Sequence, residues 1–579
     1  MSNALKNQLN LSLLFGIIFS SFSQIFRFLT GHWNQVNYGN HSVIRNAYKG
    51  RISVSGRIPL LVFMLIILLL LFLSLGCIRQ PKLSGSKPNI IFIFSDDLSY
   101  RDISSYGQKM FQTPNIDILA KEGIRFTRAY AGAPECAPSR ASLMTGKHMG
   151  HCRIRANRSV RGQDHLLKSD ITVAEILKKV GYTTGFIGKW GIGLPGTEGV
   201  PYKKGFDFAY GFYDQRRAHT YFPDYIMENE KKILLPGNFG FNMERVYKYN
   251  GRPVDKIEGV ENIYDEKGLL IPDGVADPEK VVYSEELFQK AALSFIKNNK
   301  DKRFFLYYAT QIPHGPCIAP DIGKFKDKDW PLKNKEWAAM MTYLDNGVGN
   351  ILRLLKELEI DKNTVIFFAG DNGYSEWGYF GRKAWLDDPL FHNKGPWRGG
   401  KFITMEGGVR VPFFVYWPEH IQPRESDHIC ALYDFLATAA DLAGIREVPE
   451  NDGITLVPEL ENLPRKQKKH EYLYWENGTH NPHGQAVRMG KWRGYRSSPD
   501  KPVELYLIDQ DSASSHNVAD EHPDVVRKIE TIFKKAHRDS KWYINPGDDK
   551  ECIKRKKEEA IKSKTMQVST KANSTFKNN

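Results

Sequence analysis

The segment Cys136-Ala-Pro-Ser-Arg140 contains residue types that could act on an anion. Pro138 is favoured at the first position of a helix, which would leave Cys136 at the helix N-terminus. Free N–H groups at that end bind anions and lower the pKa of a thiol, and Arg140 adds a cation suited to a tetrahedral oxyanion. The pattern predicts an anion-handling cysteine, whereas a cysteine taken alone is more often an inert core residue.

Two apolar runs each end in acidic or amide side chains. Asp96 and Asp97 follow NIIFIFS, and Asp371 and Asn372 follow VIFFAG. Adjacent carboxylates repel one another unless a cation lies between them, and all four side chains offer the oxygen ligands that a hard divalent cation prefers. The preference of Asp and Asn for loop starts would explain one such pair, but two pairs at equivalent strand ends favour a metal site.

These side chains need a scaffold that brings distant strand ends together. Apolar strands are expected at 89–95, 183–187, 303–309, 364–369 and 411–416, and helices at 114–122, 172–181, 284–297, 336–358 and 432–443. Strands that alternate with helices predict an α/β domain with a mixed, mostly parallel sheet between layers of helices. Ligands bind such sheets at the carboxyl ends of the strands, where both acidic pairs lie.

The pattern changes after about residue 465. Segments 471–476, 485–496 and 503–509 are expected strands without helices between them, and a helix over 523–537 follows. We therefore expect a catalytic domain over 88–460 and a smaller C-terminal antiparallel α+β subdomain over 461–547. The charged tail, 548–579, is low in aromatic residues and favours disorder or a frayed helix.

The N-terminal residues differ from the rest of the chain. Residues 58–77 form a run of twenty residues without a charge, long enough to span a bilayer, between a basic segment (1–57) and a linker (78–87). The sequence does not decide whether 1–57 belongs to the mature protein. A lipoprotein or cleaved signal, an uncleaved membrane anchor and a buried core helix all remain open for 58–77. We expect export, with the body of the protein membrane-anchored, periplasmic or extracellular.

The net charge of +15 first suggests a polyanionic partner. Segments 1–57, 58–87 and 548–579 carry +6, +3 and +4, which leaves only +2 for 88–547. The body of the protein is nearly neutral, so no nucleic-acid partner is expected. With 41% hydrophobic and 12% aromatic residues among 579, the chain can bury a large core, which excludes global disorder.

Taken in order, the motifs resemble those of the type I sulfatases of the alkaline phosphatase superfamily. The resemblance runs through most of 88–540 and includes NIIFIFSDDLS, TPNIDILAKEGIRFTRAYA, CAPSRASLMTG, GYTTGFIGKWG, FFLYYATQIPHGP, FFAGDNG and KFITMEGGVRVP. It implies an alkaline-phosphatase-like fold and a sulfuric ester hydrolase. It also implies that a maturation enzyme oxidises Cys136 to formylglycine. One hydroxyl of the hydrated gem-diol attacks sulfur, and the second expels sulfate from the covalent sulfo-enzyme intermediate.

The resemblance also implies roles for individual residues. The metal ligands would be Asp96, Asp97, Asp371, Asn372 and the group made from Cys136, with Ca²⁺ the usual cation of the family. The cations that steady the diol or the sulfate oxygens would be Arg140, Lys189 and Lys401. His314, in Pro-His-Gly, matches a histidine that protonates the leaving oxygen or binds sulfate.

One position departs from the family pattern. Many members have a histidine where this chain has Gly191, in GKWGIG, and glycine cannot transfer a proton. Either His314 carries more of the proton transfer or another histidine takes part, and His219 is the nearest candidate. His148 and His151 are alternatives that we expect only to support their loop.

The substrate must carry a sulfate ester, and we expect a sulfated saccharide or small molecule. Segment 474–490 suits either sugar binding or a subdomain core through Tyr474, Trp475, Glu476, His480, His483 and Arg488. Three other functions stay open: a phosphonate or phosphate monoester hydrolase of the same superfamily, an inactive sulfatase-like binding protein, and a membrane-bound structural protein with an incidental motif.

Overall fold

A computed structural model describes residues 82–215, 217–241, 264–272, 275–315, 317–375, 387–477 and 484–575. The chain divides into two units, Met1–Arg79 and Gln80–Asn579, and the described residues all belong to the second. The apolar run 58–77 lies outside them, as do His480 and His483. Within the described ranges, no helix is both long enough and apolar enough to cross a membrane.

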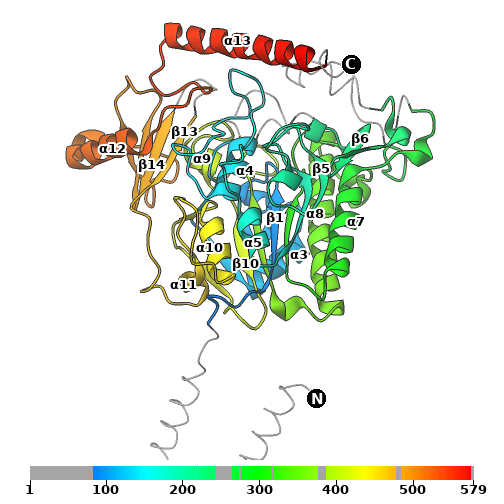
Figure 1. Cartoon of the computed structure of the whole chain (residues 1–579). Helices are drawn as coiled ribbons and strands as arrows, with labels where there is room; N and C mark the ends of the chain where they lie inside the picture. The colour runs from blue at the N-terminus through cyan, green and yellow to red at the C-terminus, as the bar shows by residue number, and fades with distance from the viewer. Residues whose placement is uncertain are drawn as a thin grey trace, which may run out of the picture. The chain divides into compact units, whose positions relative to one another are not determined.

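The described residues form a ten-stranded mixed sheet at the centre of the second unit (Figure 1). Its middle consists of neighbouring parallel strands in the order β9 (Thr364–Gly370), β1 (Asn89–Ser95), β8 (Phe304–Ala309), β4 (Thr183–Lys189) and β5 (Phe208–Phe212). The β9 edge is extended by β10 (Phe413–Tyr416), β2 (Ile124–Phe126) and β11 (Arg424–Ser426), and the other edge by β6 (Tyr225–Glu228) and β7 (Lys231–Leu234). The predicted mostly parallel sheet is confirmed, although β10 runs antiparallel to β9.

Helices cover both faces of the sheet because its central strands are mostly apolar. Every residue of β1, β8 and β9 is buried. Along β1, Ile90 and Phe92 pack in one cluster with α4 (Cys136–Thr145), α5 (Val173–Lys179) and α10 (Asp434–Leu442). Ile91 and Ile93 pack in a second cluster with α3 (Pro114–Glu122), α7 (Ser284–Asn298) and α8 (Leu332–Glu357). The alternation of side chains along a strand thus builds two cores.

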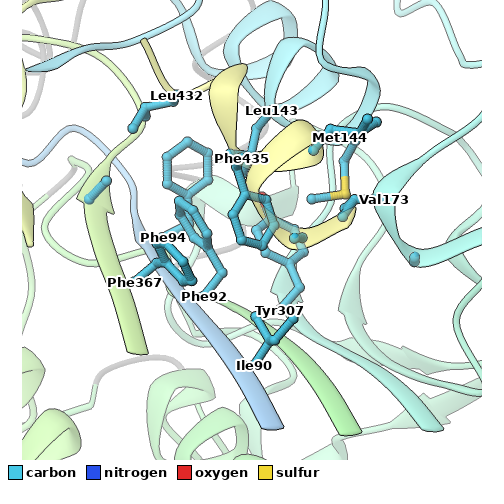
Figure 2. Close-up of a cluster of buried hydrophobic side chains, with 14 of the residues drawn as sticks. Ile90, Phe92, Phe94, Leu143, Met144, Val173, Tyr307, Phe367, Leu432 and Phe435 are labelled. Carbon is cyan, nitrogen blue, oxygen red and sulfur yellow. The ribbon is translucent and has the colours of Figure 1, made fainter. Parts of the chain in front are cut away.

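Aromatic contacts fix the helices that lie over β1. Figure 2 shows Phe92 of β1, Phe367 of β9 and Phe435 of α10 in one cluster, beside Leu143 of α4. The Phe92 and Phe435 rings meet edge to face with centroids 4.6 Å apart, and Phe367 stacks on Phe92 at 6.0 Å. Each fully buried ring contributes about 1.5–3 kcal/mol by leaving water. This packing holds α4 at a fixed place over the strand ends.

The C-terminal region forms its own small layer. Within the described residues, β13 (Leu473–Glu476), β14 (Gln485–Met489), β15 (Trp492–Arg496) and β16 (Glu504–Leu507) make a four-stranded antiparallel sheet, with α12 (Pro523–Ala536) packed on it. Tyr474, Trp475, Glu476 and Arg488 are buried, which agrees with the core interpretation of 474–490. The tail, for which the sequence favours disorder or a frayed helix, is helical over α13 (Lys550–Thr575).

Short elements complete the described fold. They are β3 (Ala129–Tyr130), β12 (Cys430–Ala431), α9 (Glu406–Val409) and α11 (Val457–Leu460). The loop between β9 and α9 carries Lys401 and brings this side chain to Asp97, at the carboxyl end of β1.

Candidate active site

The carboxyl ends of four neighbouring parallel strands bring most of the predicted site residues together. Asp96 and Asp97 follow β1, Asp371 and Asn372 follow β9, Lys189 ends β4, and His314 lies in the loop after β8. Parallel strands all end at one edge of a sheet, so residues far apart in sequence become neighbours there.

Helix α4 supplies Cys136 and Arg140. The helix begins at Cys136 itself, so Pro138 occupies its third position rather than the first position that the sequence favours. Arg140 lies four residues later and therefore on the same face as Cys136. Its guanidinium donates from Nη2 to Asp371 Oδ2 at 2.9 Å and from Nη1 to the carbonyl of Lys189 at 2.6 Å. One buried side chain thus joins α4, β9 and β4.

Two lysines pair with the acids that follow β1. Lys189 Nζ lies 2.5 Å from Asp96 Oδ2, and Lys401 Nζ lies 2.8 Å from Asp97 Oδ2. Neither lysine is more than 3% exposed, and both aspartates are fully buried. Buried charges are stable only when they are paired, and Asp371 with Arg140 completes a set of three carboxylates and three cations.

The pKa of the Cys136 thiol corrects one expectation. Burial raises it well above its usual range, and the Asp96 carboxylate raises it further. The lowering expected from a helix N-terminus is therefore wrong for this thiol, because desolvation and a nearby negative charge outweigh the helix. The surroundings of Cys136 therefore do not favour a thiolate nucleophile. This agrees with the expectation that a group derived from Cys136, rather than the thiol itself, is the nucleophile.

Two buried oxygen atoms of the site have no hydrogen-bond donor among the described residues. Asp96 Oδ1 and Asn372 Oδ1 are buried and accept no hydrogen bond from the described residues, while Asn372 Nδ2 donates to Asp97 Oδ1 at 2.8 Å. Burial and the Asp96 carboxylate raise the pKa of Asp371 to about 7, whereas Lys189 and Lys401 hold the pKa values of Asp96 and Asp97 below their usual range. Asp96, Asp97, Cys136 and His314 each offer a ligand atom within 4.8 Å of the others. The two aspartates of this group and Asn372 Oδ1 offer the oxygen ligands that a hard divalent cation prefers.

The ring of His314 has a defined orientation. Its Nδ1 is hydrogen-bonded to the carbonyl of Gly315, and because a carbonyl only accepts, we assign the proton to Nδ1. Burial lowers the pKa of His314 to about 4, so the ring is neutral at pH 7. Nε2 and Asp97 Oδ2 then face each other as two acceptors 3.4 Å apart. A proton or a cation between them would stabilise this arrangement.

The structure brings His219 to the site but leaves His148 and His151 away from it. The His219 ring stacks on His314 with centroids 4.2 Å apart, and burial lowers the pKa of His219 well below its usual range. His151 Nδ1 contacts Asp452 at 2.9 Å, and the backbone N–H of His148 donates to the same carboxylate. Both follow the C-terminal end of α4, the opposite end of the helix from Cys136, where they support their loop.

Gln215 fills the place beside Gly191, and sequence reasoning missed it. Gly191 has φ +76°, and a Cβ there would lie 2.2 Å from Gln215 Nε2. A side chain at 191 is therefore excluded unless Gln215 moves. Gln215 is buried, and its only sequence signal is its nearness to His219 in QRRAHT.

The fold and the site define an enzyme that acts on an anionic ester with the help of a buried cluster of cations. Residues 88–445 match the family model described as Sulfatase, and the chain belongs to this family. It is a sulfuric ester hydrolase, as the sequence predicts. Members of the family generally use formylglycine and a divalent metal.

Individual relatives cover most of the chain. An N-acetylgalactosamine-6-O-sulfatase of Bacteroides thetaiotaomicron is 28% identical over 495 residues, which are 78% of this chain and 93% of the relative. An arylsulfatase of Hemicentrotus pulcherrimus is 30% identical over 442 residues, covering 71% and 67%. The crystal structure of Ps i-CgsB in complex with k-i-k-neocarrahexaose is similar with a TM-score of 0.62 and 29% identity, covering 79% and 95%. These comparisons confirm the alkaline-phosphatase-like fold.

Proposed function

We propose that this chain hydrolyses a sulfate ester on a saccharide, releasing an alcohol and inorganic sulfate. The observation that carries the proposal is the buried set of Lys189, Lys401 and Arg140 around Cys136 at the strand ends. The saccharide is supported by the relative named N-acetylgalactosamine-6-O-sulfatase and by the neighbour crystallised with k-i-k-neocarrahexaose.

A maturation enzyme would convert Cys136 to formylglycine, whose hydrated form supplies the attacking hydroxyl. Asp96, Asp97, Asp371 and Asn372 would hold the cation, for which we propose Ca²⁺ because their ligand atoms are all oxygen. When bound, this cation supplies positive charge that favours ionisation of the hydroxyl and offsets the charge of the sulfate.

The chain's own cations stabilise charge that develops on the sulfate. Lys189 and Lys401 approach from different elements, and Arg140 is held in place by Asp371 and by the Lys189 carbonyl. All three side chains are buried, so water screens their charges weakly. Preorganised cations of this kind usually supply the largest catalytic contribution.

His314 suits proton transfer at Nε2. Its Nδ1–H is used by Gly315, so the neutral ring presents a lone pair at Nε2. This nitrogen would accept the proton of the attacking hydroxyl and pass it to the leaving oxygen.

Two experiments test the proposal. Mass spectrometry of the peptide containing Cys136, from protein made in its own host, should show the mass lost when CH₂–SH becomes CHO, whereas ordinary oxidation adds mass. Unmodified cysteine there would contradict the mechanism.

The second experiment compares turnover of different esters. N-acetylgalactosamine 6-sulfate and sulfated galactan oligosaccharides are assayed beside 4-nitrophenyl sulfate, 4-nitrophenyl phosphate and the corresponding phosphonate. The comparison separates a sulfatase from the related phosphonate and phosphate hydrolases.

We propose also that the apolar run 58–77 directs export or anchors the protein, so that 88–547 faces outward. The support is the run of twenty uncharged residues between basic flanks. Fractionation of the native host tests this, since recovery of the activity in the cytosol would contradict it.

A further inference from the structure

Asn477 follows β13 of the C-terminal sheet, and its side chain reaches two segments of the catalytic site. Nδ2 donates to the carbonyl of Phe402 at 2.6 Å, and the same side chain interacts with the carboxylate of Glu135. Phe402 directly follows Lys401, and Glu135 directly precedes Cys136. Asn477 is only 1% exposed. One buried amide therefore touches the chain beside the nucleophile position and beside a sulfate-binding cation.

We propose that Asn477 is a positioning residue, which fixes Lys401 relative to Cys136 from the C-terminal subdomain. The proposal rests on the sulfatase function proposed above. It gives the C-terminal sheet a part in catalysis that does not require the sheet to touch the substrate.

The backbone at Phe402 needs such support. Its φ is +72°, in the left-handed region that bulky residues rarely adopt and that persists only where surrounding contacts hold it. The Phe402 N–H donates to the carbonyl of Pro134 at 2.7 Å, and its own carbonyl accepts from Asn477. The loop that carries Lys401 is thus tied to the segment before Cys136 both directly and through Asn477.

The position requires a hydrogen-bond donor. The amide NH₂ of Asn477 donates to the carbonyl of Phe402, and a carboxylate lies near it at Glu135. Aspartate has the same shape but would place a second acceptor against the Phe402 carbonyl and a second carboxylate near Glu135, whereas alanine would leave the Phe402 carbonyl without this donor. Either change should release Phe402 and move Lys401 Nζ from its place 2.8 Å from Asp97 Oδ2.

The test compares Asn477→Asp and Asn477→Ala with a matched control, Gln485→Glu. Gln485 is a buried amide of the neighbouring strand β14 that donates to Tyr474 and contacts neither Phe402 nor Glu135 in the described hydrogen bonds. Each full-length protein is assayed for unfolding temperature, affinity for inorganic sulfate by calorimetry, and kcat and KM. Rates are expressed per formylglycine-containing molecule, as measured by mass spectrometry.

We expect kcat to fall about 100-fold in Asn477→Asp and about tenfold in Asn477→Ala, because small displacements of a catalytic group are costly. Sulfate affinity should fall about tenfold in Asn477→Asp, since one cation leaves the anion site. The control should keep kcat and sulfate affinity within about twofold, because Gln485 contacts Tyr474 and Arg496 rather than the two segments of the site. The proposal would be overturned if Asn477→Asp kept both its kcat and its affinity for sulfate, or if the control lost as much of each as Asn477→Asp does.

Sulfate binding also separates the two proposals. If the wild-type protein binds sulfate but cleaves no sulfate ester, the proposed function fails, while the comparison of sulfate affinities still tests the role of Asn477.

Discussion

The imidazole rings of His219 and His314 lie stacked, with centroids 4.2 Å apart and planes 12° from parallel. His314 Nε2 lies 3.4 Å from Asp97 Oδ2, and His219 covers the face of its ring. This contact joins the segment after β5 to the loop after β8. It supplies a second imidazole in a site where Gly191 provides none.

The first prediction concerns His219. His219→Ala should lower kcat about 100-fold, because general acid–base groups and their supports typically contribute this much. Steady-state kinetics under saturating substrate measures the loss. His219→Phe keeps an aromatic ring against His314 but has no nitrogen, so full activity in this variant would assign only a packing role. Nearly unchanged turnover in His219→Ala would refute any role in catalysis.

The second prediction concerns the nucleophile position. In Cys136→Ser, a serine that stays unoxidised has no gem-diol, so if it reacted it would keep the sulfate as a stable ester. We expect no more than one turnover per molecule and no measurable kcat. Intact-mass measurement after incubation with substrate tests this through the mass of an added SO₃ group. Sustained multiple turnover by the variant would contradict the requirement for formylglycine.

The third prediction concerns the cation. Ca²⁺ should raise the unfolding temperature of the chelator-treated protein, because it binds only the folded site, with about 2.7 kcal/mol gained at 100 times the Kd. Activity lost on chelation should return with Ca²⁺. The thermal shift is the direct measurement, since it does not depend on turnover.

A matched pair of variants locates that cation. Asn372→Ala removes a buried amide that donates to the predicted ligand Asp97, and it should abolish most of the thermal shift. Asn393→Ala removes another buried asparagine, one that donates to Asp102, and it should keep the shift. Equal behaviour of the two variants would place the cation elsewhere.

The fourth prediction concerns the pH dependence of stability. Glu285 accepts the N–H of Gln311 at 2.7 Å, and burial raises the pKa of this carboxyl to about 7 from 4.5. The folded state therefore keeps a proton that the unfolded state has already lost. The resulting loss of stability begins near pH 4.5, grows until about pH 7 and is constant above it, up to about 3 kcal/mol.

Glu285→Gln should remove this dependence. The unfolding temperature of the variant, measured relative to that of the wild type, should be higher at pH 8 than at pH 5. Thermal unfolding followed by circular dichroism at both values measures it. The same difference at both pH values would show that Glu285 does not titrate in this range.

The sequence predicted the elements that carry the site with good accuracy. The run NIIFIFS forms β1 over 89–95, and the capping box that begins at Thr172 starts α5. Such elements are readable because hydrophobic periodicity and helix caps act over a few neighbouring residues. The sequence analysis did not predict the strands β5 to β7, which form one edge of the sheet. His219 lies in the segment between β5 and β6.

The sequence by itself determined the chemistry: the order of the motifs, the paired acids after two buried strands, and the cysteine with its arginine one turn away. Only the tertiary structure decided how the site is completed. It raised rather than lowered the pKa of Cys136, filled the space beside Gly191 with Gln215, and set Asn477 against Phe402, 75 residues away. The reason is physical: residue type and spacing fix local conformation, whereas desolvation and contacts across the chain depend on how separate elements pack.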